Sequence, residues 1–555
     1  MSVPNHSSRT KAGIRKLSEG GNGLKFKASP ASAAGSPVSA ASSPGTRMEK
    51  DTMGPMEVPA SALYGASTQR AVLNFPVSGR PVPFGILSAY AAIKSACATV
   101  NLGLDRLDLK RTKAIVAACR QIADGLPEHG GWATHFPIDI YQTGSGTSTN
   151  MNANEVIANL ICLANGKPVG SSKDAEYLKA GGVHPNDHVN MGQSSNDTFP
   201  TAMHVAAAVA IYRELLPAVQ RIASELEQKA KAWDKIVKIG RTHLQDATPI
   251  RLGQEFSGYA SQMRHAEERL GRALDTLSEL PIGGTAVGTG INAHEKFGAL
   301  VAAELTAFFS PGRGKKGSTA SAGASSNSLT FREASNHFEA QHAKDAIVEV
   351  SGHLKTIAVS ISKIANDIRW LGSGPRCGLG ELVLPAVQPG SSIMPGKVNP
   401  VICESAIMVC CQVIGNDAAI TLGGMGGVGS MLDLNVAMPM MAANLLDSIH
   451  LLARTCHVFT DNLLVALKPD EKRCAELIEG SLAMCTSLVP VIGYDKSAAL
   501  AKEAFKQGKT VRQLAHETVA GQKDVSGKEI TKAQIDKYLD PWSMTLPGGE
   551  GSAGG

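Results

Sequence analysis

The sequence lacks several features that would place it in a common protein class. It contains no uninterrupted run of 18 apolar residues, so we expect no membrane span. Its ten cysteines form no CxxC pair and have no histidine at zinc-finger spacing. This pattern argues against structural zinc and gives little support for an iron–sulfur cluster. We therefore expect free thiols in a reducing compartment.

Most of the chain also has no excess of positive or negative charge. The formal net charge is +5, but the first 50 residues hold eight Lys or Arg against two Glu. The remaining 505 residues carry 46 basic and 47 acidic groups. A body that is close to neutral is not a nucleic-acid binder by charge.

Aromatic residues make up only 5% of the chain, whereas hydrophobic residues make up 43%. The chain as a whole is rich in Ala and Gly. This composition is typical of a soluble, helical protein. A length of 555 residues exceeds what one core holds, so several domains are expected.

Two segments contain few large apolar groups. Residues 1–48 are basic and rich in Ser, Ala, Gly and Pro, and we expect them to be disordered. Their Ser, Arg and Lys content with few acids is also typical of an organelle transit peptide, and this alternative stays open. Residues 311–328 are of low complexity and predict a disordered surface insertion.

Helical periodicity is strongest at residues 350–371. Apolar residues there recur at steps of four and three, which predicts a coiled-coil-like seam: Val350, Leu354, Ile357, Ile361, Ile364, Ile368 and Leu371. Further helices are expected at 86–101, 107–125, 200–233, 251–279 and 401–422, with a kink at Pro217. Rods of this length predict a helical bundle that packs across subunits.

The segment 383–404 interrupts these rods. Two glycines and three prolines within 389–400 exclude a helix and make a strand improbable. The segment offers hydroxyls, an ammonium and an amide. Composition alone is equally compatible with a cationic lid over an anionic substrate and with a plain connector.

Three other segments are similarly polar, at 143–152, 193–197 and 240–248. We expect each to lie at the end of a helix, where hydroxyls and backbone N–H groups bind carboxylates well. Together the four segments supply many neutral donors, one Lys and one His, with few acids. No nucleotide-binding or metal-binding pattern accompanies them, and the Gly-rich stretch 283–290 matches neither a P-loop nor a dinucleotide fingerprint. This is the composition of a small-dicarboxylate site.

The amino-acid sequences of these segments resemble those of the fumarase/aspartase superfamily. The resemblance extends from about Asp51 to Pro541. The resemblance rests on five motifs, GSSIMPGKVNP, TGSGTSTNMN, QSSNDTFPT, GRTHLQDATP and GGTAVGTG. Within the superfamily the sequence is similar to class II fumarases rather than aspartases, which typically have Ala at the position of Gly396 and Thr at that of Ser195. The resemblance implies a mainly α, three-domain fold and a homotetramer with a central twenty-helix bundle. It also implies active sites shared by three subunits, and reversible hydration of fumarate to (S)-malate without metal or cofactor.

Residue roles follow from the same resemblance. Ser391 would be the base for the C3 proton of malate, and His243, supported by Glu404, would handle the proton of water. The other implied substrate-binding residues are Ser145, Gly146, Thr147, Asn150, Ser194, Ser195, Asn196, Thr242, Ser392, Lys397 and Asn399. Proton removal beside a carboxylate develops an aci-carboxylate dianion, which preorganised donors and Lys397 would stabilise.

A second, non-catalytic dicarboxylate site is also implied, at His184, Pro185, Asn186 and Asp187. Several members of the family place a basic residue three positions before that histidine. Here Gly181 stands at that position, which leaves anion binding at this second site open.

The domain boundaries follow from the same reading. We expect a tail at 1–48, an N-terminal domain at 49–192, a helical bundle at 193–466, a small C-terminal domain at 467–543 and a flexible end at 544–555. The partners would be fumarate and malate, with no nucleic acid or membrane. The location would be the cytoplasm, or an organellar matrix if the tail is a transit peptide. Two alternatives are an aspartate ammonia-lyase and a non-catalytic structural member of the superfamily, such as some lens proteins.

Overall fold

The computed structural model describes residues 45–309 and 329–547. The predictions made for residues 1–44, for the 311–328 insertion and for residues 548–555 lie outside this part of the chain. The chain divides into two compact units. Unit 1 comprises Met1–Leu216, Arg269–Thr356 and Gln412–Leu452, and unit 2 comprises Pro217–Glu268, Ile357–Cys411 and Ala453–Gly555.

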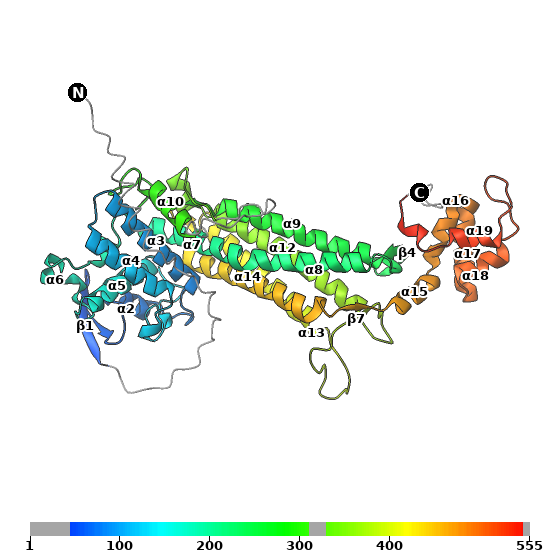
Figure 1. Ribbon diagram of the computed structural model, residues 1–555, viewed down its shortest axis with the longest axis horizontal. Coiled ribbons are helices and arrows are strands. Elements are labelled where there is room, and N and C mark those ends of the chain that lie inside the picture. Colours follow the sequence, from blue (N-terminus) through cyan, green and yellow to red (C-terminus); the bar gives the residue numbers. More distant parts are fainter. Residues whose placement is uncertain (1–44, 310–328, 548–555) are drawn as a thin grey trace, which may run out of the picture. The chain divides into compact units, whose positions relative to one another are not determined.

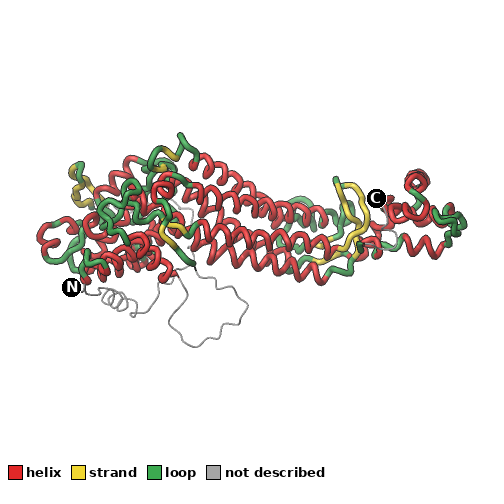
Figure 2. The backbone as a smooth tube through the Cα atoms, turned by 90° about the horizontal axis from the view of Figure 1, so that it is seen from above, coloured by secondary structure: helices red, strands yellow, loops and turns green. Residues whose placement is uncertain are grey.

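Helices dominate the described residues, and each sheet among them has only two strands (Figure 2). The mainly α class is therefore confirmed. The first half of the chain contains the following elements: β1 (Thr46–Asp51), β2 (Gly54–Pro59), α2 (Ala66–Asn74), α3 (Phe84–Gly103), α4 (Leu109–Ala123), η1 (Pro127–His129), η2 (Trp132–Thr134), α5 (Thr147–Ala164), η3 (Ser171–Lys173), α6 (Ala175–Lys179), η4 (Pro185–Val189), α7 (Ser195–Ala210), η5 (Ile211–Leu215), α8 (Leu216–Ala232), β3 (Val237–Thr242), β4 (Gln245–Arg251) and α9 (Leu252–Thr276).

The second half continues with β5 (Glu279–Leu280), α10 (Phe297–Phe309), β6 (Arg332–Glu333), α11 (His337–His342), α12 (Asp345–Leu371), β7 (Leu382–Val383), α13 (Val401–Gly424), β8 (Ser430–Met431), β9 (Leu434–Asn435), α14 (Met438–Phe459), η6 (Thr460–Leu464), β10 (Lys468–Pro469), α15 (Glu471–Gly480), η7 (Leu482–Leu488), α16 (Val489–Ile492), α17 (Tyr494–Gln507), α18 (Val511–Thr518), α19 (Lys532–Tyr538) and η8 (Ser543–Thr545).

In unit 1, α3 forms the centre of the core. Its sequence is apolar on every face, and a helix of that kind is stable only when neighbours surround it. Helices α4, α7 and α10 all pack against α3, and α4 also packs against α5 (Figure 1). The polar segments before α5 and α7 are therefore held by the best-packed part of this unit.

In unit 2, a separate small core lies near the C-terminus. Helices α15 to α19 and η7 enclose Leu488, Ala504, Leu514, Ile535 and Leu539 (Figure 1). The β3–β4 hairpin and the segment 384–400 are also in this unit. Neither has a large core of its own, which suits segments that carry functional side chains.

The heptad seam is confirmed. All seven of its residues are buried along α12. The π-helical turn η5 ends at Leu215, two residues before Pro217, and the kink at Pro217 stays a prediction. In segment 384–400 the chain has no regular element and α13 begins at Val401, as the prolines predict.

Two predicted tail boundaries are wrong by a few residues. Strand β1 begins at Thr46, inside the segment expected to be disordered, because Arg47 is tied to the body of unit 1. Its guanidinium donates to the carbonyls of Pro59, Ala62 and Tyr64 at 2.8, 2.7 and 2.5 Å. At the other end, Thr545 is buried and its carbonyl accepts from Gln254 at 3.1 Å.

Candidate active site

The first polar segment lies at the start of α5. Gly146 has φ +73°, and a Cβ there would lie 2.0 Å from the ring of Phe199, so only glycine fits this position. The hydroxyls of Ser145 and Thr147 lie 2.8 Å apart. This turn therefore places two hydroxyls beside the N-terminal N–H groups of a helix, where an anion is favoured.

The second polar segment starts α7 and meets the first. Ser194 caps this helix in a capping box with Asp197. The Ser195 hydroxyl lies 2.7 Å from that of Thr147. Asn196 is fixed beside them by donating to the Ala286 carbonyl at 2.8 Å. Two helix N-termini thus converge on one cluster of hydroxyls, an arrangement that favours a bound carboxylate.

Asp197 ties a third segment to this cluster. Its carboxylate accepts from the backbone N–H of Ser194 at 2.9 Å, of Gly283 at 3.2 Å and of Thr285 at 3.0 Å. Burial raises the pKa of Asp197 to about 7, and the three N–H donors act in the opposite direction. The Gly-rich stretch 283–290 is thereby held against the start of α7, a role that its composition does not reveal.

Asn150 sits one turn into α5 and is buried within a polar network. Its Oδ1 accepts from the ammonium of Lys94 at 2.7 Å. The same ammonium donates to Asn190 Oδ1 at 2.8 Å. Sequence reasoning missed Lys94, although it is the single charged residue in the apolar helix α3, and this was the signal that could have revealed it.

In unit 2, His243 lies at the tip of a hairpin and not at a helix end. The expectation for 240–248 is therefore wrong. His243 and Leu244 form a two-residue turn with φ +57° and +59°, the signs required by a type I′ turn. Thr242 and His243 are exposed at this tip. The tip of the hairpin leaves these two side chains exposed. A pattern of helical periodicity cannot detect such a short antiparallel pair.

The segment 390–400 is closed by its own hydrogen bonds. Gly390 N–H donates to the Lys397 carbonyl at 2.8 Å, and Asn399 Nδ2 donates to the Gly390 carbonyl at 2.7 Å. Gly396 has φ +81°, a left-handed backbone conformation that glycine adopts without strain. The side chains of Ser392 and Lys397 are exposed.

Ser391 occupies a distinctive place in this loop. Its Oγ accepts from the backbone N–H of Ile393 at 3.3 Å and of Met394 at 3.1 Å. Donors of this kind stabilise negative charge on the oxygen. The arrangement therefore suits a serine that must carry an alkoxide.

The structure brings together some of the predicted residues and not others. Ser145, Thr147, Ser195 and Asn196 form one connected cluster in unit 1. Within the described part of unit 2, no hydrogen bond or ion pair joins His243 to Ser391 or to Glu404. Glu404 is exposed in the first turn of α13. The predicted support of His243 by Glu404 is thus not a contact within one chain.

The second predicted dicarboxylate segment forms a tight local structure. His184 Nδ1 accepts from the N–H of Asp187 at 3.1 Å and lies 3.2 Å from its carboxylate. Burial lowers the pKa of His184 while Asp187 opposes this. Lys110 approaches Gly181 closely, since a Cβ there would lie 3.2 Å from the ammonium. A cation from α4 therefore lies beside Gly181.

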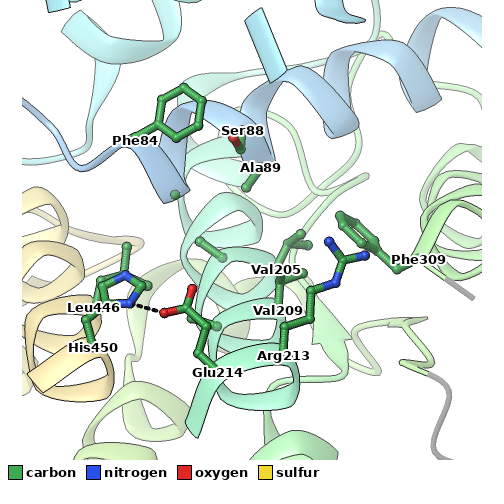
Figure 3. A pocket seen from close by; sticks show the side chains of 13 residues that line it. Phe84, Ser88, Ala89, Val205, Val209, Arg213, Glu214, Phe309, Leu446 and His450 are labelled. Carbon is green, nitrogen blue, oxygen red and sulfur yellow. Dashed lines mark hydrogen bonds and ion pairs between the residues drawn. The ribbon is translucent and has the colours of Figure 1, made fainter. Parts of the chain in front are cut away.

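A cavity of about 250 Å³ lies elsewhere in unit 1 (Figure 3). Its walls come from α3, α7, η5, α10 and α14, and Glu214 pairs with His450 at 2.8 Å on one side. Arg213 lies over the Phe309 ring on the other side, at 5.8 Å (Figure 3). None of the predicted site residues lines this cavity. Across residues 45–309 and 329–547, no three His, Cys, Asp or Glu side chains are grouped so that they could hold a metal.

Comparisons with known proteins agree with this architecture. Residues 54–415 match a family model described as "Lyase", and residues 484–546 match one described as "Fumarase C C-terminus". The class II fumarate hydratase of Corynebacterium glutamicum is 49% identical over 498 residues, which cover 90% of this chain and 96% of that relative. The class II fumarate hydratase of Mycobacterium tuberculosis is 47% identical, with the same coverage.

Solved structures show the same likeness. A class II fumarase from Schistosoma mansoni has a TM-score of 0.80 at 37% identity, covering 91% of this chain and all of that one. A Brucella melitensis protein described as "fumarate lyase:delta crystallin" has a TM-score of 0.79 at 39% identity, again over 91% of this chain and all of that one. The chain therefore belongs to the class II fumarate hydratase family of lyases.

Proposed function

We propose that this chain catalyses the reversible hydration of fumarate to (S)-malate through an aci-carboxylate intermediate. The observation that supports this most directly is the 2.7 Å contact between Thr147 and Ser195, because it joins two helix N-termini into one dicarboxylate cluster. The family assignment supplies the reaction class, a carbon–oxygen hydro-lyase.

In the malate direction, Ser391 acts first. Its alkoxide takes the C3 proton, and the electrons of the C–H bond move onto the adjacent carboxylate to form the dianion. The N–H groups of Ile393 and Met394 favour this alkoxide. Lys397, Asn399 and the helix N-termini in unit 1 then stabilise the two developing charges more than they stabilise malate itself.

His243 completes the reaction. The electrons of the dianion form the C2–C3 double bond while the C2–O bond breaks. Protonated His243 donates its proton to the leaving hydroxide, so the products are fumarate and water. In the reverse direction the neutral imidazole deprotonates the attacking water, with Glu404 from another subunit as its support.

We infer that the working enzyme is a homotetramer whose active sites combine three subunits. Helix α13 is long and apolar, yet Met408, Ile414 and Leu422 are exposed on it. Apolar patches of this kind indicate a protein contact. By length and composition alone, this helix and Ser195–Ala232 could also cross a membrane. The family assignment favours subunit packing instead.

The test is an absorbance assay with fumarate, malate and aspartate and no added metal. We expect turnover of fumarate and malate only. Exchanging Ser391→Ala should lower kcat by about 10²–10⁴-fold, the usual contribution of a positioned base. Turnover of aspartate alone would identify an ammonia-lyase, and inactivity toward all three would support the non-catalytic alternative. Full activity of the Ser391 variant would overturn its assignment as base.

We place the reaction in the tricarboxylic acid cycle of the cytoplasm, or of an organellar matrix if residues 1–48 form a transit peptide. N-terminal sequencing of the native protein separates the two locations, because a cleaved transit peptide would remove the basic segment.

A further inference from the structure

Lys94 is a fully buried lysine that contacts Asn150, one helical turn from the hydroxyl cluster of Ser145, Thr147 and Ser195. It lies in the middle of α3 with none of its surface exposed. Its ammonium donates to Asn150 Oδ1 at 2.7 Å and to Asn190 Oδ1 at 2.8 Å. No carboxylate forms an ion pair with it among the described residues. A buried cation without a paired carboxylate is costly, so the two amide oxygens that contact it must offset part of that cost.

The ammonium fixes which way two amides point. A lysine ammonium has only donors, so both atoms that face it must be oxygens. The Nδ2 group of Asn150 must therefore point away from Lys94. Asn190 Oδ1 accepts one of its N–H groups at 3.2 Å and also accepts from Asn154 at 3.2 Å. Asn190 Nδ2 in turn donates to the Gln193 carbonyl at 3.1 Å.

The second N–H of Asn150 Nδ2 has no acceptor among the described residues. Asn150 lies one helical turn beyond Ser145, Gly146 and Thr147, and the Thr198 hydroxyl reaches its Oδ1 at 3.4 Å. A substrate carboxylate held by the first turns of α5 and α7 is the natural acceptor for this remaining N–H. Without Lys94 the amide could rotate and present its oxygen to the anion instead.

The charge of Lys94 has a second consequence. Burial lowers the pKa of Lys94 to about 8, so the group stays cationic at neutral pH. The nearby carboxylate of Asp197 is already held by three backbone N–H groups. In a buried environment of low dielectric constant, the electrostatic attraction of the ammonium extends over several ångströms. It therefore stabilises the aci-carboxylate dianion more than a substrate whose charge is less concentrated.

We propose that Lys94 is a positioning residue of the hydration site, which orients the Asn150 amide toward the substrate carboxylate and supplies a buried positive charge beneath the aci-carboxylate. This inference rests on the proposed function. It differs from a purely structural role, because it predicts an effect on turnover that depends on Asn150.

The experiment compares Lys94→Met with Lys344→Met in the full-length protein. Lys344 is also buried, but its ammonium caps three backbone carbonyls, those of Ala340, Gln341 and Ala343, at 2.6–3.1 Å. Methionine fills the space of either lysine without charge. We expect Lys94→Met to raise KM for fumarate, because the Asn150 amide loses its orientation, and to lower kcat by about tenfold to hundredfold, the usual range for a lost charged hydrogen bond. Lys344→Met should lower the melting temperature and leave kcat nearly unchanged.

A double-mutant cycle with Asn150→Ala separates positioning from independent effects. We expect the loss of kcat caused by Lys94→Met to be smaller once Asn150 is alanine, because only the direct effect of the buried charge then remains. Equal losses in both backgrounds would overturn the positioning role, and so would unchanged kcat and KM in Lys94→Met. Circular dichroism and the native mass identify any variant that has lost its fold.

Lys94→Gln keeps a donor without the charge, and it serves also if the methionine variant does not fold. It should restore KM for fumarate toward the wild-type value while kcat stays low. If kcat recovers as well, the buried charge has no catalytic effect and that part of the proposal is wrong. Failure of the wild-type protein to hydrate fumarate would instead refute the proposed function, which the variants cannot mimic.

Discussion

At the scale of single residues, buried polar side chains in unit 1 do more than the sequence motifs indicate. His204 lies on α7 with 7% of its surface exposed, and its Nδ1 has no hydrogen-bond partner among the described residues. Burial, with a further contribution from Lys344, lowers its pKa to about 4. The native protein therefore holds this imidazole in its neutral form throughout the neutral and mildly acidic range.

This shift gives a pH dependence of stability with a defined sign. The unfolded chain binds a proton at His204 below about pH 6.5, whereas the native state does so only near pH 4. Between these values the unfolded state binds more protons, so stability decreases as the pH falls. At pH 5 the loss from this one group should be about 2 kcal/mol.

The measurement is urea unfolding of the wild type and of His204→Gln at pH 7 and pH 5. Carboxylates elsewhere contribute equally to both proteins, so the difference between them isolates the histidine. We expect the variant to lose less stability between the two pH values. Parallel losses in the two proteins would show that His204 is protonated in the native state.

The site residues could be predicted from sequence only where local chemistry is concentrated. Ser145, Thr147, Ser194 and Ser195 stand in dense polar segments at the starts of helices. In the structure the hydroxyls of Ser145, Thr147 and Ser195 form one chain of contacts. Lys94 lies 51 or more residues before them in an apolar helix. Its contact with Asn150 depends on tertiary packing of α3 against α5 and the segment before α7, which spacing along one chain cannot reveal.

At the scale of elements, the β3–β4 hairpin depends on a buried ion pair in unit 2. Arg241 on β3 donates to the carboxylate of Glu381 at 2.8 Å, and Lys238 lies 3.5 Å from the same carboxylate. Glu381 is fully buried. This pairing fixes the strand that carries Thr242 and His243.

Neutralising Glu381 should therefore be expensive. Glu381→Gln leaves Arg241 and Lys238 without their shared carboxylate, and loss of one partner of a buried pair costs about 3–5 kcal/mol. The matched control is Glu227→Gln, which removes an exposed partner of Arg264 at 2.7 Å. Exposed pairs of this kind contribute about 0–1 kcal/mol. Urea unfolding measures both, and equal losses would contradict the special role of the buried pair.

Elements were predictable where a periodic pattern of apolar residues continues over many residues. The seam on α12 has seven apolar positions between residues 350 and 371, and every one is buried as expected. The β3–β4 hairpin was missed because its turn is His243-Leu244. The Asn-Gly or Asp-Gly pair that normally marks a type I′ turn is absent, and a leucine at φ +59° is an unusual choice. Local strain at this turn is consistent with a functional constraint on His243.

At the scale of the whole molecule, apolar side chains on α12 and α13 are exposed, and the proposed contact between subunits would cover them. Trp370 and Met408 are 47% and 67% exposed in the single chain. Of the predicted site residues in unit 2, His243, Lys397 and Glu404 are exposed and Ser391 is half-buried, and His243 has no hydrogen-bond partner among the described residues. Both facts have one explanation if other copies of the chain complete the sites. Sequence periodicity predicts that such helices associate, but it does not specify which copy supplies which residue.

Subunit complementation tests this shared site most directly. Ser391→Ala and His243→Asn are co-expressed with different affinity tags, and mixed tetramers are isolated through both tags. If the two residues of each site come from different subunits, some sites in a mixed tetramer contain both wild-type side chains. Random assembly then predicts about a quarter of the wild-type fumarate hydration rate. Activity in the mixed tetramers no higher than that of the separate variants would contradict an active site built from several subunits.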